Sequence, residues 1–491
     1  MEDYRRIQEE PQTLEAVLAA RDRRASIQAA LIREKACPVM TLTVNMPGPI
    51  KRTALSAFYF HGHLNKLQAL LEGVGARIES KVLFQEPSGD EAVLAVSGLS
   101  AQGLKSLALY LEDQEAWSRL LDLDVLDPQG QPVKRASLGL PARTCLVCGQ
   151  RASVCSAGRL HAPDDLTEER DRLLMAYASR TLADRLAGLA AEASSFELML
   201  APKPGLVTPF DAGSHRDMDR FTFVGSQSRL LSYYGQAFLA GWTPGFTDRE
   251  RVLRIRLAAI GAEEDMLTET GGVNTHRGWI YTAGIFLMAM GSCLAPVFQK
   301  DRQNNQGAGL VQDLARRTRQ IAQSLETSLE EEACLSGLWA RQRSEVPIRG
   351  ARQEALSGFP SVFTLGLPVL RQSLLAGRDG NSAGLRSLLA ILASVQDTTL
   401  IKRGSPVLAS AFQETIGRAL GLEGRAKAEA LAEALVRLED RSLLELMTQL
   451  SEDFSRLELT CGGAADLAAV SRLADRFLEL FQAQDAGVMR L

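Results

Sequence analysis

From about residue 166 onward, the sequence repeats one pattern: apolar residues recur at helical spacing, and long strand-like runs are lacking. Segments with this periodicity cover residues 168–200, 250–270, 279–297, 309–335, 381–400, 406–437 and 440–456. Each such helix has to bury its apolar stripe against other helices. We therefore expect residues 166–491 to form an all-α helical domain, interrupted by a polar loop from Asp301 to Gly309.

The first 165 residues follow a different pattern. A helix with arginines on one face is expected over residues 11–36, and a second helix over about 61–74. Strand-like runs occupy Val39–Met46, Ile78–Phe84 and Ala92–Val96. This mixture predicts an α+β domain, for which a nucleotidyltransferase-like fold is one option. The polar, proline-containing stretch that begins at His161 places the boundary near residue 165, which gives domains 1–165 and 166–491.

The length, net charge and cysteine count of the chain exclude some classes of protein. A chain of 491 residues is too long for one ordinary core. Its formal net charge of −4 gives no general attraction to nucleic acid or to an anionic membrane, so we expect neither as a partner. The seven cysteines are an odd number, which argues against a disulfide framework.

The N-terminus and one apolar segment indicate where in the cell the protein is expected. Met1–Arg6 is charged and lacks the apolar run of a signal peptide. Residues 278–299 carry no charge and nearly reach the length of a bilayer span, but they contain Gly284, Gly291 and Pro296. We expect a buried helix in a large helical domain and a cytoplasmic protein.

The stretch Thr270–Gly278 is the most unusual turn between two predicted helices. Gly271 and Gly272 permit backbone conformations that other residues avoid, and Asn274, His276 and Arg277 follow closely. Glycine-turn amides and a helix N-terminus both favour an anion. The alternative is a helix cap, a tight turn and the next helix start, which explains the glycines but not the polar side chains.

Other polar motifs of the second half also fall between predicted helices. They are Lys203–Val207, Gly213–Asp219, Gly350–Ser361, Asp397–Gly404 and Gly462–Asp466. Three of the five histidines, His161, His215 and His276, lie within or beside such motifs. Helical domains build ligand sites where several helix ends converge, so we expect these turns to meet.

Two charged motifs stand out in the first half. Asp122 and Asp124 alternate with apolar residues on a predicted strand, so their carboxylates share one face and could hold Mg²⁺. A solvated acidic face of an edge strand is the alternative. Lys51 and Arg52 follow the turn Pro47–Pro49 and could hold a phosphate, although a surface hairpin is the commoner case.

The spacing Cys145-x2-Cys148-x6-Cys155-x5-His161 offers four ligands for tetrahedral Zn²⁺. The second half of this spacing is not that of a standard zinc finger. The alternative is a set of three buried or free thiols.

Taken in order, these motifs resemble two known families joined end to end, over nearly the whole chain. The first half resembles the apo-citrate-lyase phosphoribosyl-dephospho-CoA transferase family through Asn45–Lys51, Asp122–Val125, Cys145–Gly149 and His161. The second half resembles the triphosphoribosyl-dephospho-CoA synthase family through Lys203–Val207, His215–Asp219, Thr270–His276 and Leu356–Pro360. Two positions depart from the family pattern, Thr399 where we expect asparagine and Ala464 where we expect serine.

The second resemblance implies that the helical half joins ATP to 3′-dephospho-CoA and releases adenine. The candidates for binding the phosphates are Lys203, His215, Gly271, Gly272, Asn274 and Arg277. The catalytic candidates are His215, Asp217, Asp219 and His276, with Mg²⁺ on the two aspartates or one of them acting as base.

The first resemblance implies transfer of phosphoribosyl-dephospho-CoA to a serine of the apo acyl carrier (γ) subunit of citrate lyase, with loss of pyrophosphate. Asp122 and Asp124 would hold Mg²⁺, while Lys51 and Arg52 or the helix arginines would neutralise pyrophosphate. Two alternatives remain at this point: the same chemistry serving malonate decarboxylase, and a non-enzymatic adaptor that binds a carrier protein.

Overall fold

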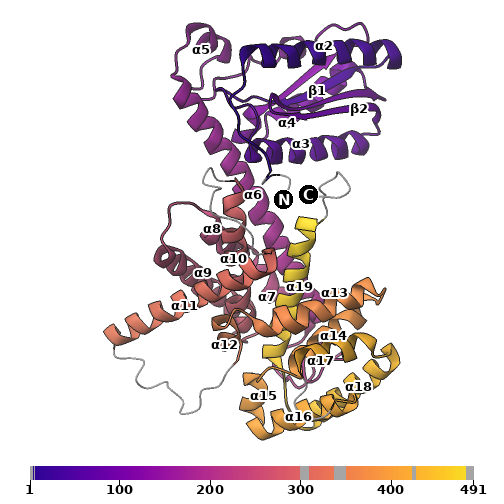
Figure 1. The fold of residues 1–491 in the computed structure, drawn as a ribbon, viewed down its shortest axis with the longest axis vertical. Helices are drawn as coiled ribbons and strands as arrows, with labels where there is room; N and C mark the ends of the chain where they lie inside the picture. The colour runs from indigo at the N-terminus through magenta and orange to yellow at the C-terminus, as the bar shows by residue number, and fades with distance from the viewer. Residues whose placement is uncertain (1–3, 5, 299–308, 337–349, 423–426, 483–491) are drawn as a thin grey trace. The chain divides into compact units, whose positions relative to one another are not determined.

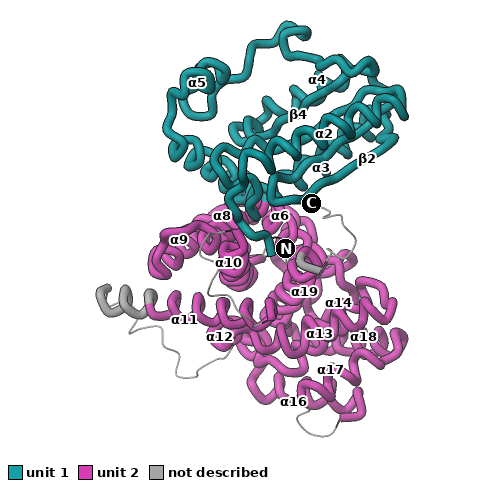
Figure 2. The backbone as a smooth tube through the Cα atoms, turned by 45° about the horizontal axis from the view of Figure 1, so that its top comes forward, with its two compact units in different colours: residues 1–181, 483–491 teal, residues 182–482 magenta. Residues whose placement is uncertain are grey.

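The computed structural model describes residue 4 and residues 6–298, 309–336, 350–422 and 427–482. The loop expected over residues 301–309 therefore lies outside the described residues, apart from Gly309. The chain forms two compact units, residues 1–181 and 182–482, shown in two colours in Figure 2. Helix α6 (Pro163–Met199) contributes to both, and the boundary expected near residue 165 falls in its first turn.

Unit 1 contains a four-stranded antiparallel sheet of order β2-β3-β1-β4. The strands are β1 (Val39–Val44), β2 (Arg77–Glu86), β3 (Gly89–Ser97) and β4 (Leu121–Leu126). Helix α2 (Leu14–Lys35) covers one face, where Leu31 packs on Val39 and Val93. Helices α3 (Ala54–Gly73) and α4 (Ala101–Glu112) cover the other face (Figure 1). The expected α+β class is confirmed.

The register of the sheet places the acidic strand. On β1, Thr43 is paired with Asp122 of β4 and Thr41 with Asp124. Since side chains alternate along a strand, both carboxylates lie on the face that α2 covers. The prediction that Asp122 and Asp124 share a face is confirmed.

The described part of unit 2 is helical, which confirms the expected class. After α6 its helices are α7 (Arg220–Arg229), α8 (Leu231–Trp242), α9 (Asp248–Glu269), α10 (Arg277–Phe298), α11 (Leu310–Ser336), α12 (Ala351–Leu356), α13 (Leu367–Leu375), α14 (Gly380–Leu392), α15 (Thr398–Arg403), α16 (Pro406–Ala419), α17 (Ala428–Arg437), α18 (Asp440–Arg456) and α19 (Gly462–Gln482). The single helix expected over 381–400 is wrong, because Asp397 caps a new helix, α15, by accepting from the amides of Thr399 and Leu400. The helix expected over 406–437 is likewise two helices, α16 and α17.

Helix α10 is the core of unit 2. It is the one helix in the described part of the chain that is long and apolar enough to cross a membrane, and 83% of its apolar window is buried inside the protein. Glycines let α8 and α10 pack closely: a Cβ on Gly241 would lie 1.9 Å from the carbonyl oxygen of Met288. The segment is buried against other helices, as expected from its sequence.

Candidate functional sites

A cavity of about 430 Å³ in unit 2 gathers the polar turns that the sequence singles out. The N-terminal ends of α10 and α19 open onto it, together with the first residues of α15. Six predicted residues line it: Lys203, His215, Asp217, Asn274, His276 and Arg277. Helix N-termini carry partial positive charge, so an anion is favoured in this cavity.

His215 lines this cavity, and one of its ring nitrogens has no hydrogen-bond partner among the described residues. Its Nε2 lies 3.2 Å from the Thr460 hydroxyl, whereas its buried Nδ1 has no hydrogen-bond partner among the described residues. Burial, reinforced by the nearby Arg403, lowers the pKa of His215. The imidazole is therefore neutral near pH 7 and can accept a proton. Asp217, whose carboxylate is exposed, lies 3.9 Å from Nδ1.

His276 is held more tightly than His215. Its Nδ1 lies 2.7 Å from the Ser226 hydroxyl, and its Nε2 lies 3.3 Å from the Ser194 hydroxyl. Burial lowers the pKa of His276 to about 4. Since both ring nitrogens are already engaged, this geometry suits an orienting role better than proton transfer.

The two predicted phosphate-binding cations of the cavity, Lys203 and Arg277, differ in their surroundings. Lys203 is buried, and its Nζ donates to the Glu197 carboxylate and to the Glu197 carbonyl oxygen, both at 2.7 Å. Arg277 is half-exposed and pairs with Glu263 at 2.9 Å. Asn274 accepts from the amide of Arg277 and so begins α10. Arg277 is the cation better able to move toward a ligand.

Three predicted residues do not line this cavity. Gly271 and Gly272 form an exposed left-handed turn after α9, in which the Gly272 amide donates to the carbonyl oxygen of Leu267. Asp219 caps α7 by accepting from the amides of Phe221 and Thr222. The two glycines thus match the helix-cap alternative, and Asp219 uses its carboxylate to cap a helix.

The structure also brings in three carboxyl groups that sequence reasoning did not select: Glu197, Asp397 and Asp466. Asp397 and Asp466 belong to polar turns already identified, which was the available signal, but Glu197 lies within a long helix and gave none. The two departures from the family pattern meet here, since Thr399 and the Ala464 amide both donate to Asp397.

In unit 1, a cleft of about 400 Å³ runs along β4. Asp122 and Asp124 line it with Lys105 and Arg143. Arg143 pairs with Asp122 at 2.9 Å. The surrounding protein atoms, and then the neighbouring Asp122, raise the pKa of Asp124. Repulsion between two adjacent carboxylates is what a divalent cation relieves.

The other predicted phosphate ligands of unit 1 are engaged elsewhere. Lys51 donates to the carbonyl oxygen of Met46 at 2.8 Å, and Arg52 pairs with the buried Asp90 at 2.9 Å. Neither lines the cleft beside Asp122 and Asp124. On the same sheet face, Arg24 of α2 pairs with Glu91 at 3.1 Å, and Glu91 and Asp122 are both paired with Thr43 of β1. Arg24 also lies near enough to Asp124 to favour its ionised form.

The four predicted zinc ligands converge. The Sγ atoms of Cys145, Cys148 and Cys155 and a ring nitrogen of His161 all lie within 4.8 Å of one another. Burial opposes ionisation of Cys145, but hydrogen bonds from the amides of Cys148 and Val147 and from the Cys155 and Cys148 thiols together lower the thiol pKa to about 7. Three sulfurs and one imidazole at this separation fit a tetrahedral metal site.

A larger cavity of about 990 Å³ lies beside this cluster, within unit 1. Glu112, Arg135 and Arg143 line both this cavity and the β4 cleft. Glu112 is buried and accepts from the Leu123 amide, from Arg135 and from Arg143. Glu112, Arg135 and Arg143 therefore form an ionic cluster that lies between the large cavity and the β4 cleft of unit 1.

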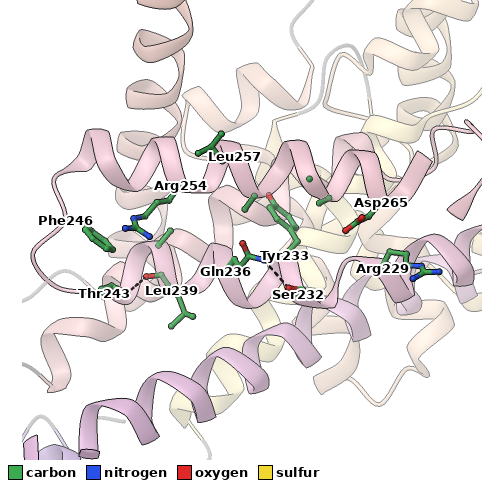
Figure 3. A pocket seen from close by; sticks show the side chains of 14 residues that line it. Arg229, Ser232, Tyr233, Gln236, Leu239, Thr243, Phe246, Arg254, Leu257 and Asp265 are labelled. Atoms are coloured by element: carbon green, nitrogen blue, oxygen red, sulfur yellow. Dashed lines mark hydrogen bonds between the residues drawn. The ribbon is translucent and has the colours of Figure 1, made fainter. Parts of the chain in front are cut away.

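Another cavity, of about 650 Å³, lies between α8 and α9 (Figure 3). Arg254 and Phe246 lie at one end, and Arg229 and Asp265 at the other (Figure 3). None of the predicted site residues lines it. A variant in this cavity can therefore serve as a control for variants in the cavity at the helix N-termini.

Comparison with known proteins agrees with this division of sites. Residues 12–177 match the model of the apo-citrate lyase phosphoribosyl-dephospho-CoA transferase family, and residues 183–485 match that of the ATP:dephospho-CoA triphosphoribosyl transferase family. The chain belongs to the second family, with a domain of the first fused in front of it. It is therefore a transferase with two catalytic domains, and the adaptor alternative is set aside.

Two curated relatives match this chain over nearly its whole length, and a third matches its second part. Protein CitXG of Haemophilus influenzae is 29% identical over 94% of this chain and 95% of its own length. Protein CitXG of Leuconostoc mesenteroides subsp. cremoris is 28% identical over 92% of this chain and 94% of its own length. A probable 2-(5''-triphosphoribosyl)-3'-dephosphocoenzyme-A synthase of Azotobacter vinelandii is 34% identical over 60% of this chain and 92% of its own length.

Proposed function

We propose that the cavity at the N-termini of α10 and α19 is where ATP and 3′-dephospho-CoA react. The observation that carries this proposal is the meeting of Lys203, His215 and Arg277, from three separate turns, at converging helix N-termini. Such a site offers a triphosphate both positive charge and backbone donors. The 2′-hydroxyl of dephospho-CoA attacks ribose C1′ of ATP, and adenine departs.

The roles of the side chains follow from their surroundings. The unpartnered Nδ1 of His215 accepts the hydroxyl proton, with Asp217 beside it. Mg²⁺ usually keeps several waters and takes one or two protein carboxylates together with substrate phosphates. Of the two aspartates Asp217 and Asp219, only Asp217 lines the cavity, so we assign the ion to Asp217 and the triphosphate.

The test is chromatography of purified protein mixed with ATP, Mg²⁺ and dephospho-CoA. We expect free adenine that depends on dephospho-CoA, and a loss of at least 100-fold in Asp217→Asn. The matched control is Asp265→Asn, which removes an exposed aspartate of the α8–α9 cavity. Formation of ADP or AMP in place of adenine would reject this site chemistry.

For unit 1 we propose transfer of the phosphoribosyl-dephospho-CoA group to a serine of the apo acyl carrier subunit of citrate lyase, with release of pyrophosphate. Asp122 and Asp124 would hold Mg²⁺ at the reacting phosphates, where the ion withdraws charge from the phosphorus under attack. Arg143 and Lys105 are two of the cations that line the same cleft, and we add them to Lys51 and Arg52 as candidates for neutralising pyrophosphate.

Zn²⁺ completes the proposal for unit 1. Cys145, Cys148, Cys155 and His161 would bind it with all four protein ligands, which is typical of a structural site. It would hold the turn at Cys145 in place. Arg119 donates to the carbonyl oxygens of Thr144 and Cys145, so this turn is tied to the rest of unit 1.

The test supplies preformed triphosphoribosyl-dephospho-CoA and measures labelling of the carrier. Asp124→Ala should lose most transfer, and Glu72→Ala, which removes an exposed carboxylate at the end of α3, should lose none. Undiminished transfer by Asp124→Ala would mean that this strand is only an acidic surface. Preferred labelling of the carrier of malonate decarboxylase would change the partner but keep the chemistry.

A further inference from the structure

Glu197 and Asp466 line the unit 2 cavity, Asp397 lies close enough to act on Asp466, and the three carboxyl groups differ in their surroundings. Glu197 accepts from Lys203 at 2.7 Å. Asp397 accepts from the amides of Thr399 at 2.8 Å, Leu400 at 3.0 Å and Ala464 at 2.6 Å. Both of these groups therefore have hydrogen-bond donors directed at their carboxyl oxygens.

The carboxyl group of Asp466 differs from these two in its contacts. Within the described part of the chain, neither a hydrogen bond nor an ion pair reaches its carboxyl group, which lines the cavity. It lies over the first turn of α10, where a Cβ on Gly278 would fall 1.9 Å from its Oδ2 atom. Gly278 thus leaves the space that the Asp466 carboxyl group occupies.

The charges around Asp466 oppose its ionisation. Burial, followed by the carboxylates of Glu197 and Asp397, raises its pKa well above the ordinary value of 3.8. The other titratable and charged groups of the cavity and its inner wall are Lys203, His215, Asp217, His276, Arg277, Arg403 and Cys461. Lys203 is neutralised by Glu197, and Arg277 by Glu263.

We propose that Asp466 is the general acid that protonates adenine as it leaves, an inference that rests on the proposed synthase function. The 2′-oxygen of dephospho-CoA bonds to C1′ while the C1′–N9 bond breaks, and that electron pair goes to the base. The Asp466 proton moves to a ring nitrogen of adenine, and the hydroxyl proton moves to His215. Exchange with solvent then returns both groups to their starting states.

The cavity thereby holds an acid and a base with opposite protonation needs. The carboxylates of Glu197 and Asp397 oppose loss of the Asp466 proton, whereas Nδ1 of His215 has no hydrogen-bond partner among the described residues. A carboxylic acid and an imidazole in one cavity can serve as the acid and the base of one reaction. Adenine is a poor leaving group without a proton, so an acid at this wall contributes directly to the rate.

The experiment compares ATP with its 8-azaadenine analogue, whose leaving base is more acidic and needs less protonation. Asp466→Asn should lower kcat for adenine release from ATP by about 100- to 1,000-fold and leave KM nearly unchanged. The loss should shrink by at least tenfold with the analogue. Wild-type kcat should fall as pH rises through the pKa of Asp466, and Asp466→Asn should lack that fall.

A second variant tests the geometry. Gly278→Ala places a methyl group where the carboxyl group lies, so it should also lose adenine release from ATP more than from the analogue. Urea unfolding reports whether unit 2 remains folded in both variants. An equal loss with both triphosphates would overturn the acid role of Asp466, as would full activity of Asp466→Asn. If the wild type itself releases no adenine, the synthase proposal fails first.

Discussion

The buried pair of Lys203 and Glu197 supports a prediction that separates stability from catalysis. The Lys203 side chain is 1% exposed and that of Glu197 is 12% exposed, with 2.7 Å between Nζ and Oε1. Lys203→Met keeps most of the volume and removes the charge. It leaves the Glu197 carboxylate without its cation beside Asp397 and Asp466.

The expected cost follows from that burial. Removing one partner of a buried ion pair destabilises a protein by about 3–5 kcal/mol, because a buried charge is left uncompensated. The partial exposure of Glu197 favours the lower end, about 3 kcal/mol. The double variant Lys203→Met/Glu197→Gln has no orphaned charge and should recover most of this loss. Arg229→Met is the matched control, since its pair with Glu269 is largely exposed and should cost under about 1 kcal/mol.

Urea unfolding gives the free energies, and adenine release gives the activity. We expect the single variant to be unstable and inactive, and the double variant to be stable but still inactive, because Lys203 is also a phosphate ligand in our proposal. If Lys203→Met unfolds at the same urea concentration as the wild type, the pair is not desolvated and the reasoning is wrong. A stable double variant with full activity would remove Lys203 from the site.

Other predictions address the remaining sites. Cys148→Ser should lower the zinc content of the purified protein from one ion per chain, as measured by metal analysis. It should also reduce the thermal stability of unit 1, as measured by calorimetry. Equal metal content in the variant and the wild type would contradict the assigned ligands. Burial lowers the pKa of His276 to about 4, whereas the pKa of an unfolded histidine is about 6.5. The folded protein should therefore lose free energy of unfolding, on the order of 3 kcal/mol, as the pH falls from about 6.5 toward 4. His276→Gln should flatten this part of the stability profile, and an unchanged slope would show that another group titrates. Asp219→Ala should cost about 1 kcal/mol of stability through the lost cap of α7 but keep most adenine release, since Asp219 lies outside the cavity.

Much of the architecture was determined by local sequence pattern. Helical periodicity identified most of the long helices of unit 2, and alternation placed Asp122 and Asp124 on one face of a strand. The spacing from Cys145 to His161 predicted a cluster that the fold assembles. These features succeed because their physical causes act over a few residues: the period of a helix or strand, and the short reach of a turn.

Only the tertiary structure decided which polar groups meet. Gly271 and Gly272 belong to the most unusual turn in the sequence, yet they cap a helix, and Asp219 does the same. Glu197 gave no sequence signal, and it meets Asp397 and Asp466 only because α6, α15 and α19 converge. Side-chain burial and charge pairing depend on neighbours that are distant in sequence, so the raised pKa of Asp466 and the ion pair of Lys203 follow from packing rather than from any motif.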